Sequence, residues 1–217
     1  MVVCWSVKGG VGTSVVSVAM AVASARRTDT LLIDLGGDLP AMLGLAEPDG
    51  PGFCEWLGAD AVGVEAIGRL EREAGTRLRM VHRGRSSLDG AARAASAGAA
   101  LAADARAVVV DAGRFGLDDA ADRVRRALLE GATRSILVLR PCYLALRRAL
   151  AAPVRPDGIV LLSEPGRAIS RTDVSDVLGR PVLAEIPIDP AIARAVDAGL
   201  LASRLPDGLA RALCDVA

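Results

Sequence analysis

A glycine-rich segment near the start of the chain, SVKGGVGTSVVSV (6–18), has the residue types that bind phosphate. It follows an apolar run and opens a helix-like stretch, which is the context that a phosphate-binding loop requires. Such a loop ends in Gly-Lys-Ser/Thr, with the lysine reaching the β- and γ-phosphates and the hydroxyl holding Mg²⁺. Here Thr13 stands in the lysine position and Ser14 follows it, so the loop keeps its hydroxyl and loses its lysine.

An anion cradle does not depend on that lysine alone. Glycines let the backbone approach a ligand and direct N–H groups at it. A helix that begins near Thr13 adds the positive end of its dipole. We therefore predict that the loop binds phosphate through its backbone, with Ser14 placed for Mg²⁺. The alternative is a glycine-rich turn that holds no ligand.

Lys8 is the only lysine among the 26 basic residues of the chain, and it lies in this loop. Lysine is a compact point charge, whereas arginine presents a wide planar fork. A chain that uses arginine everywhere else has kept the compact cation here, which favours a specific role over chance.

Composition limits the classes of protein that the chain can be. With 217 residues, 52% apolar residues and a net charge of zero, it predicts one large α/β domain without a general attraction for nucleic acid. The four cysteines (Cys4, Cys54, Cys142, Cys214) are far apart, which favours reduced thiols in a cytosolic protein over disulfides or zinc. No apolar run reaches transmembrane length, and the first residues enter a strand, so we expect no signal peptide.

The elements that would position the loop alternate along the chain between apolar strands and helix-like stretches. Unbroken Val, Leu and Ile runs are typical of parallel strands buried on both faces. The expected strands are 2–7, 30–35, 77–82, 107–112, 135–140, 158–163 and 182–187. The expected helices are 13–26, 41–46, 53–58, 88–104, 118–130, 142–151, 171–178, 190–200 and 206–214. This order predicts an α/β fold: a doubly wound, mostly parallel sheet of about seven strands flanked by helices, with ligands at the carboxyl edge.

Several motifs together resemble the ParA/MinD superfamily of P-loop ATPases. The loop KGGVGTS is similar to the deviant phosphate-binding loop of that family, and AVVVDAG, with Asp111, resembles its Walker B strand. LLIDL, with Asp34, looks like the strand before switch I. The segment 171–199 resembles the family's closing pattern, with a strand that ends I-P-x-D. The resemblance covers residues 1–217 as a single nucleotide-binding domain, and within the superfamily it is nearest to TadZ/CpaE-like pilus assembly proteins.

The resemblance implies roles for individual residues. Lys8 would reach across a sandwich dimer to the nucleotide of the partner. ATP or ADP would lie against the loop and against the end of the last strand. Mg²⁺ would be held by Ser14, Asp34 and Asp111. The implied nucleotide contacts are Lys8, Gly9, Gly10, Val11, Gly12, Thr13, Ser14 and Pro187.

Three departures from the family pattern put turnover in doubt. Thr13 removes a positive charge beside the phosphates, a kind of loss that commonly costs about 10²–10³ in rate. Gly36 fills the position of the aspartate that orients the attacking water in the family, and Asp38 is the candidate substitute for it. Ser163 and Glu164 stand where the family often has an asparagine that reads adenine.

These observations predict an ATP-binding dimeric switch with weak or absent hydrolysis, which positions or assembles a pilus, secretion, septum or partition machine. Its partners would be a second copy and a protein cargo, and its place the bacterial cytoplasm, with recruitment to a pole, septum or nucleoid. One alternative is an active partitioning ATPase on DNA or membrane, which the zero net charge and a C-terminal stretch with one Arg, two Asp and no Trp or Phe disfavour. Another is a nucleotide-free dimeric scaffold.

Overall fold

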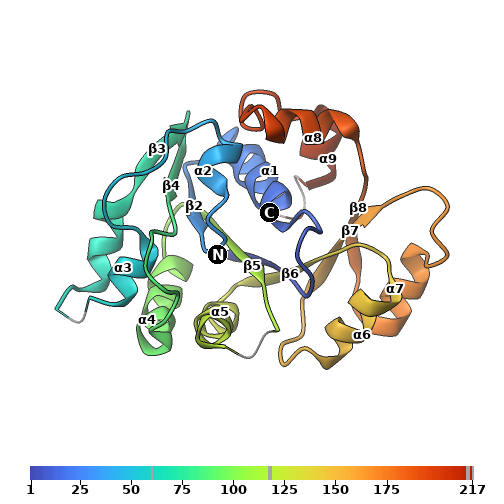
Figure 1. The fold of residues 1–217 in the computed structure, drawn as a ribbon, viewed down its shortest axis with the longest axis horizontal. Coiled ribbons are helices and arrows are strands. Elements are labelled where there is room, and N and C mark those ends of the chain that lie inside the picture. The colour runs from blue at the N-terminus through green and yellow to red at the C-terminus, as the bar shows by residue number, and fades with distance from the viewer. Residues whose placement is uncertain (60, 117–118, 214–215, 217) are drawn as a thin grey trace.

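The computed structural model describes residues 1–59, 61–116, 119–213 and 216. Its sheet has the strand order β3-β4-β2-β5-β1-β6-β7-β8, and every neighbouring pair is parallel except β3 and β4 (Figure 1). The strands are β1 (Val2–Ser6), β2 (Thr30–Asp34), β3 (Arg72–Gly75), β4 (Leu78–Val81), β5 (Ala107–Arg114), β6 (Arg134–Leu139), β7 (Gly158–Ser163) and β8 (Val182–Pro187). The predicted α/β class with a mostly parallel sheet is confirmed.

Helices cover both faces of this sheet. Figure 1 shows α1, α2, α8 and α9 on one side and α3 to α7 on the other. The helices of the first side are α1 (Thr13–Ala25), α2 (Leu39–Met42), α8 (Pro190–Asp197) and α9 (Asp207–Leu213). Those of the second are α3 (Phe53–Leu57), the 3₁₀ helix η1 (Val64–Leu70), α4 (Ala91–Ala102), α5 (Ala120–Glu130), α6 (Tyr143–Ala151) and α7 (Arg171–Leu178).

The strands are buried on both faces because successive side chains point into two separate cores. In β1, Cys4 packs in the core under α1, and its neighbours Val3 and Trp5 pack in the core under α3 to α7. Central strands that must fill both cores need continuous apolar sequence, which is the pattern that the sequence shows. None of the helices in the described ranges is long and apolar enough to cross a membrane.

The expected sheet was one strand short. β3 pairs antiparallel with β4 at the edge of the sheet, and its sequence REAG has no apolar run to reveal it. The hairpin forms because Arg77 and Gly75 take positive φ angles of 58° and 153° in the turn. The 3₁₀ helix η1 was also unexpected. Residue 118 of the fifth expected helix and Cys214, at the end of the last one, lie outside the described residues.

Candidate nucleotide site

The glycine loop joins β1 to α1 at the carboxyl edge of the sheet. Ser6, at the end of β1, donates a hydrogen bond of 3.1 Å to the carbonyl oxygen of Lys8 and so fixes the path of the chain into the loop. Gly10 and Gly12 have φ angles of 71° and 94°, the left-handed region that favours glycine. At Gly12 a Cβ would also lie 2.8 Å from a methyl group of Leu162, so no larger residue fits there without a shift.

The loop opens into a cleft of about 660 Å³, which is within the roughly 300–1,000 Å³ of ligand sites. Gly9, Gly10, Gly12, Thr13 and Ser14 line its floor, and a Cβ built on Gly9 or Gly10 would meet no atom within 4 Å. The first turn of α1 points at the same space, so its free N–H groups face the cleft. The backbone part of the predicted cradle is therefore present.

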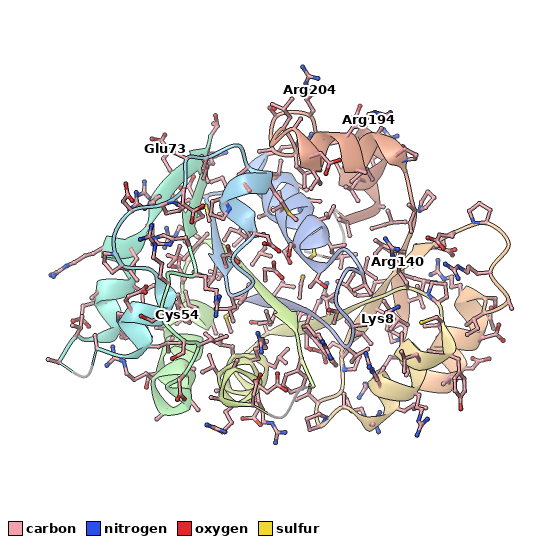
Figure 2. All side chains as sticks on the ribbon, in the orientation of Figure 1. Lys8, Cys54, Glu73, Arg140, Arg194 and Arg204 are labelled. Carbon is pink, nitrogen blue, oxygen red and sulfur yellow. The ribbon has the colours of Figure 1, made fainter. Side chains whose placement is uncertain are left out.

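Two of the predicted loop residues do not line this cleft. The side chain of Val11 is 3% exposed and packs in the core under α1, so this residue can offer a ligand only its backbone. Lys8 is exposed and is not among the residues that line the cleft, and Figure 2 labels it on the glycine loop. An exposed lysine in that position is available to another molecule.

Asp34 and Asp111 lie side by side under the cleft. Asp34 ends β2 and Asp111 lies within the neighbouring β5, where the two are direct partners in the parallel register, and both are fully buried. Asp34 accepts hydrogen bonds from the N–H groups of Gly37 (2.7 Å) and Leu39 (3.2 Å). Asp111 accepts one from the N–H of Gly113 at 3.1 Å, and its other oxygen, Oδ2, has no hydrogen-bond partner among the described residues.

Burial makes these two carboxylates hard to ionise without a cation. It raises the pKa of Asp34 to about 6, although the N–H groups of the following loop act in the opposite direction. Burial also raises the pKa of Asp111 to about 7, and the negative charge of Asp34 adds to that rise, while Ser14 and the N–H of Gly113 oppose it. A divalent cation would restore the charged form of both groups.

The predicted magnesium ligands converge on one point next to Gly36. A Cβ built on Gly36 would lie 3.5 Å from Oδ2 of Asp111, 3.6 Å from Oδ1 of Asp34 and 3.8 Å from Oγ of Ser14. Within the described residues no group of three or more His, Cys, Asp or Glu side chains gathers anywhere. Two carboxylates and a hydroxyl nevertheless fit Mg²⁺, which keeps several waters and takes further oxygens from a nucleotide.

The remaining predicted residues lie at the rim. Asp38 lines the cleft and precedes α2, but its side chain does not cap that helix, so its carboxylate is free to turn toward the site. Pro187 lines the far end together with Ile188 and Ile192. Glu164, in the position expected for an adenine-reading asparagine, pairs instead with Arg140 at 3.7 Å and with Arg167.

Sequence reasoning missed a group of arginines in this cleft. Arg83, Arg114, Arg125 and Arg140 all line it, and they come from the ends of β4, β5 and β6 and from α5. Arg140 is half-buried, whereas Arg147 and Arg148, which follow it closely in the sequence, are exposed on α6. The available signal was that each of three strands is followed or ended by an arginine at the ligand edge.

Comparison with known proteins gives matches only among solved structures, since no family model and no curated protein matches the chain. MinD in the MinC:MinD cell division complex of Aquifex aeolicus superposes with a TM-score of 0.78 at 18% identity, covering 99% of this chain and 92% of that one. A ParA family ATPase from Chlorobium tepidum gives 0.77 at 20%, covering 99% and 97%. MinD with Mg-ADP from Pyrococcus horikoshii gives 0.75 at 20%, covering 99% and 93%. The chain therefore has the fold of these ATPases.

Proposed function

We propose that this chain is a ParA/MinD-like switch that binds ATP or ADP with Mg²⁺, dimerises through the nucleotide, and hydrolyses it slowly or not at all. The observation that carries the proposal is the convergence of Asp34, Asp111 and Ser14 beneath a glycine loop whose lysine is missing. These groups would serve binding. The two positions that serve hydrolysis in the family carry Thr13 and Gly36, which supply neither an ammonium nor a carboxylate.

The solved structures of similar fold support the ligand and the kind of role. One is a MinD with Mg-ADP, another is a MinD in complex with its partner MinC, and a third is a ParA family ATPase. By analogy the chain would work in the bacterial cytoplasm as a positioning or assembly factor. The machine it serves, and its kinship with TadZ/CpaE-like pilus proteins, rest on the sequence resemblance.

Lys8 gives the proposed dimer its most specific feature. It is exposed next to a cleft that it does not line, and no ion pair between described residues includes it. A flexible cation in that place suits a phosphate held by a second copy facing the first. Lys8 would then act in the site of the partner and not in its own.

Light scattering after size-exclusion chromatography tests this function. Wild type should be a monomer without nucleotide and a dimer with Mg·ATP, while Lys8→Ala should stay monomeric and still bind Mg·ATP. Arg26→Ala, an exposed cation after α1, is the matched control and should dimerise normally. A mass that ignores Mg·ATP in wild type would contradict the switch, and a constant dimer would favour the scaffold alternative.

The alternative of an active ATPase on DNA needs a basic surface. Arg147 and Arg148 are exposed on α6, but the net charge is zero, and Arg140 is drawn into the cleft. DNA retention that weakens steeply with salt and disappears in Arg147→Ala/Arg148→Ala would favour that alternative.

A further inference from the structure

The arginines in the cleft differ in how much of their hydrogen-bonding capacity is already used. Arg125 is committed within the protein: its Nε donates to the carbonyl oxygen of Ala112 at 2.8 Å and its Nη1 to Asp122 at 3.2 Å. In Arg83 and Arg140, by contrast, the Nε is buried and has no hydrogen-bond partner among the described residues. A buried donor without an acceptor is energetically unfavourable. Both side chains therefore need a hydrogen-bond acceptor that the described protein groups do not supply and a ligand would.

Arg83 stands beside the loop that covers the candidate magnesium site. It follows β4, and its Cδ lies 3.6 Å from where a Cβ on Gly37 would be. The adjacent Gly36 is the point on which Asp34, Asp111 and Ser14 converge. No ion pair between described residues includes Arg83.

The interaction that Arg83 does make within the protein is weak. Burial raises the pKa of the Cys54 thiol on α3, and the charge of Arg83 and its hydrogen bond to the thiol oppose that rise. A thiol is a poor hydrogen-bond acceptor for a guanidinium. Most of the donor capacity of Arg83 is therefore available to a ligand.

Arg140 approaches from the other flank. It follows β6, which is the neighbour of β1 in the sheet, so it lies one strand away from the glycine loop. Figure 2 shows Arg140 and Lys8 in the region between α1 and α6. Its acidic partner among the described residues, Glu164, is 3.7 Å away and is shared with Arg167, so this pairing uses little of the guanidinium.

We propose that Arg83 and Arg140 together give the nucleotide phosphates the positive charge that a lysine at position 13 would provide. The threonine at position 13 then means that the cation comes from other residues, and not that the site has lost its ligand. The inference rests on the proposed function, because it assumes a nucleotide in the cleft. Guanidinium groups suit phosphate oxygens, since their planar fork donates two parallel hydrogen bonds. Two such groups from opposite flanks would hold the phosphates without a lysine in the loop.

Calorimetric titration of the full chain with Mg·ATP tests the arginine pair. Arg83→Ala and Arg140→Ala should each weaken the affinity about tenfold to hundredfold, the usual cost of losing a charge-assisted hydrogen bond. Arg204→Ala is the matched control, because Arg204 is exposed in the segment between α8 and α9 (Figure 2) and should bind as wild type does. Circular dichroism of each variant checks that the fold is kept.

A rescue experiment distinguishes relocation from general electrostatics. In the double variant Arg83→Ala/Arg140→Ala, the further change Thr13→Lys should restore most of the affinity, because a lysine in the loop makes the arginines redundant. Normal binding by both arginine variants would overturn the pair and leave the proposed function standing. A double variant that Thr13→Lys does not rescue would overturn the relocation. A wild type that binds no Mg·ATP would overturn both the pair and the proposed function.

Discussion

The two walls of the cleft are built from different kinds of groups. The wall from β1 to α1 is backbone: glycines in left-handed conformation and the first turn of a helix, with no cation that faces inward. The other wall carries arginine side chains, and two fully buried carboxylates, which do not line the cleft themselves, lie behind it next to Gly36. The first wall can hold an anion in place, and the second supplies the charges that a metal and a phosphate need.

The difference between the two walls indicates which residue substitutions the site tolerates. Backbone N–H groups depend on the path of the chain and not on residue type, so they survive the change from lysine to threonine at position 13. Under the proposed function, hydrolysis would depend on single side chains in fixed places, and there the chain has Thr13 and Gly36. Binding and turnover can therefore be lost separately.

The largest effect is expected when the catalytic groups are returned to the site. The double variant Thr13→Lys/Gly36→Asp should hydrolyse ATP about 10²–10³ times faster than wild type, because it restores a cation and a water-orienting carboxylate. A Cβ at Gly36 meets its neighbours at ordinary contact distances of 3.5 Å and more. Phosphate release at saturating Mg·ATP measures it. An unchanged rate would mean that other losses limit turnover.

Removing the charge of Asp111 should break the side-chain wall while leaving the backbone wall intact. Asp111→Asn should weaken Mg²⁺-dependent nucleotide binding about hundredfold and also stabilise the empty protein, because it removes a buried charge whose Oδ2 has no partner. Titration with Mg·ADP and urea unfolding measure the two effects. A loss of both affinity and stability would instead mean that Asp111 has a structural role.

The buried carboxylates predict an unusual dependence of stability on pH. Their folded pKa values, about 6 and about 7, lie above the ordinary value of 3.8, so the folded state holds protons that the unfolded state has released. Without Mg²⁺, the free energy of unfolding should therefore fall as pH rises from about 4 to about 7, by on the order of 3 kcal/mol for each carboxylate.

His82 requires a control in that experiment. Burial lowers its pKa, so it favours stability at higher pH and acts against the carboxylates below about pH 6.5. The difference between wild type and Asp111→Asn in urea unfolding at pH 5 and pH 8 isolates the carboxylate effect. If the free energy of unfolding changed with pH by the same amount in both proteins, the raised pKa of Asp111 would be contradicted.

The smallest effect concerns the segment that carries Arg83. Glu55 on α3 accepts hydrogen bonds from the N–H groups of Gly52, Arg85 and Ser86, and these outweigh the effect of burial and lower its pKa to about 2. Glu55→Ala should cost about 1–3 kcal/mol of stability and weaken Mg·ATP binding severalfold, through the misplaced Arg83. Thermal unfolding and titration measure these changes. If Glu55→Ala lowered the stability but kept the full affinity for Mg·ATP, Glu55 would have no role in positioning Arg83 for the nucleotide.

Much of the fold could be predicted from the sequence because the central strands carry their own signal. All seven expected strands are present, since a strand buried on both faces needs a continuous apolar run. The edge strand β3 was missed because one exposed edge removes that need, and REAG reads as a loop. The loop, Asp34 and Asp111 could be placed because the loop follows a recognisable strand, Asp34 ends one and Asp111 lies within one.

The arginines could not be assigned to the site for the opposite reason. Arg83, Arg114 and Arg140 lie up to 57 residues apart, and only the sheet order β4-β2-β5-β1-β6 brings them to one edge. Whether an arginine there faces the cleft or the solvent depends on its neighbours, as the exposed Arg147 and Arg148 illustrate. The spacing of these arginines in the sequence does not indicate which of the two directions each side chain takes.

The most direct test of the central claim measures binding and turnover on one preparation of wild-type protein. The account predicts saturable binding of one Mg·ATP per chain, with phosphate release no faster than that of Asp111→Ala at the same nucleotide concentration. Release that is fast in wild type and abolished in Asp111→Ala would show an active ATPase and contradict the separation of binding from hydrolysis. An absence of Mg·ATP binding would contradict the prediction that the glycine loop binds phosphate.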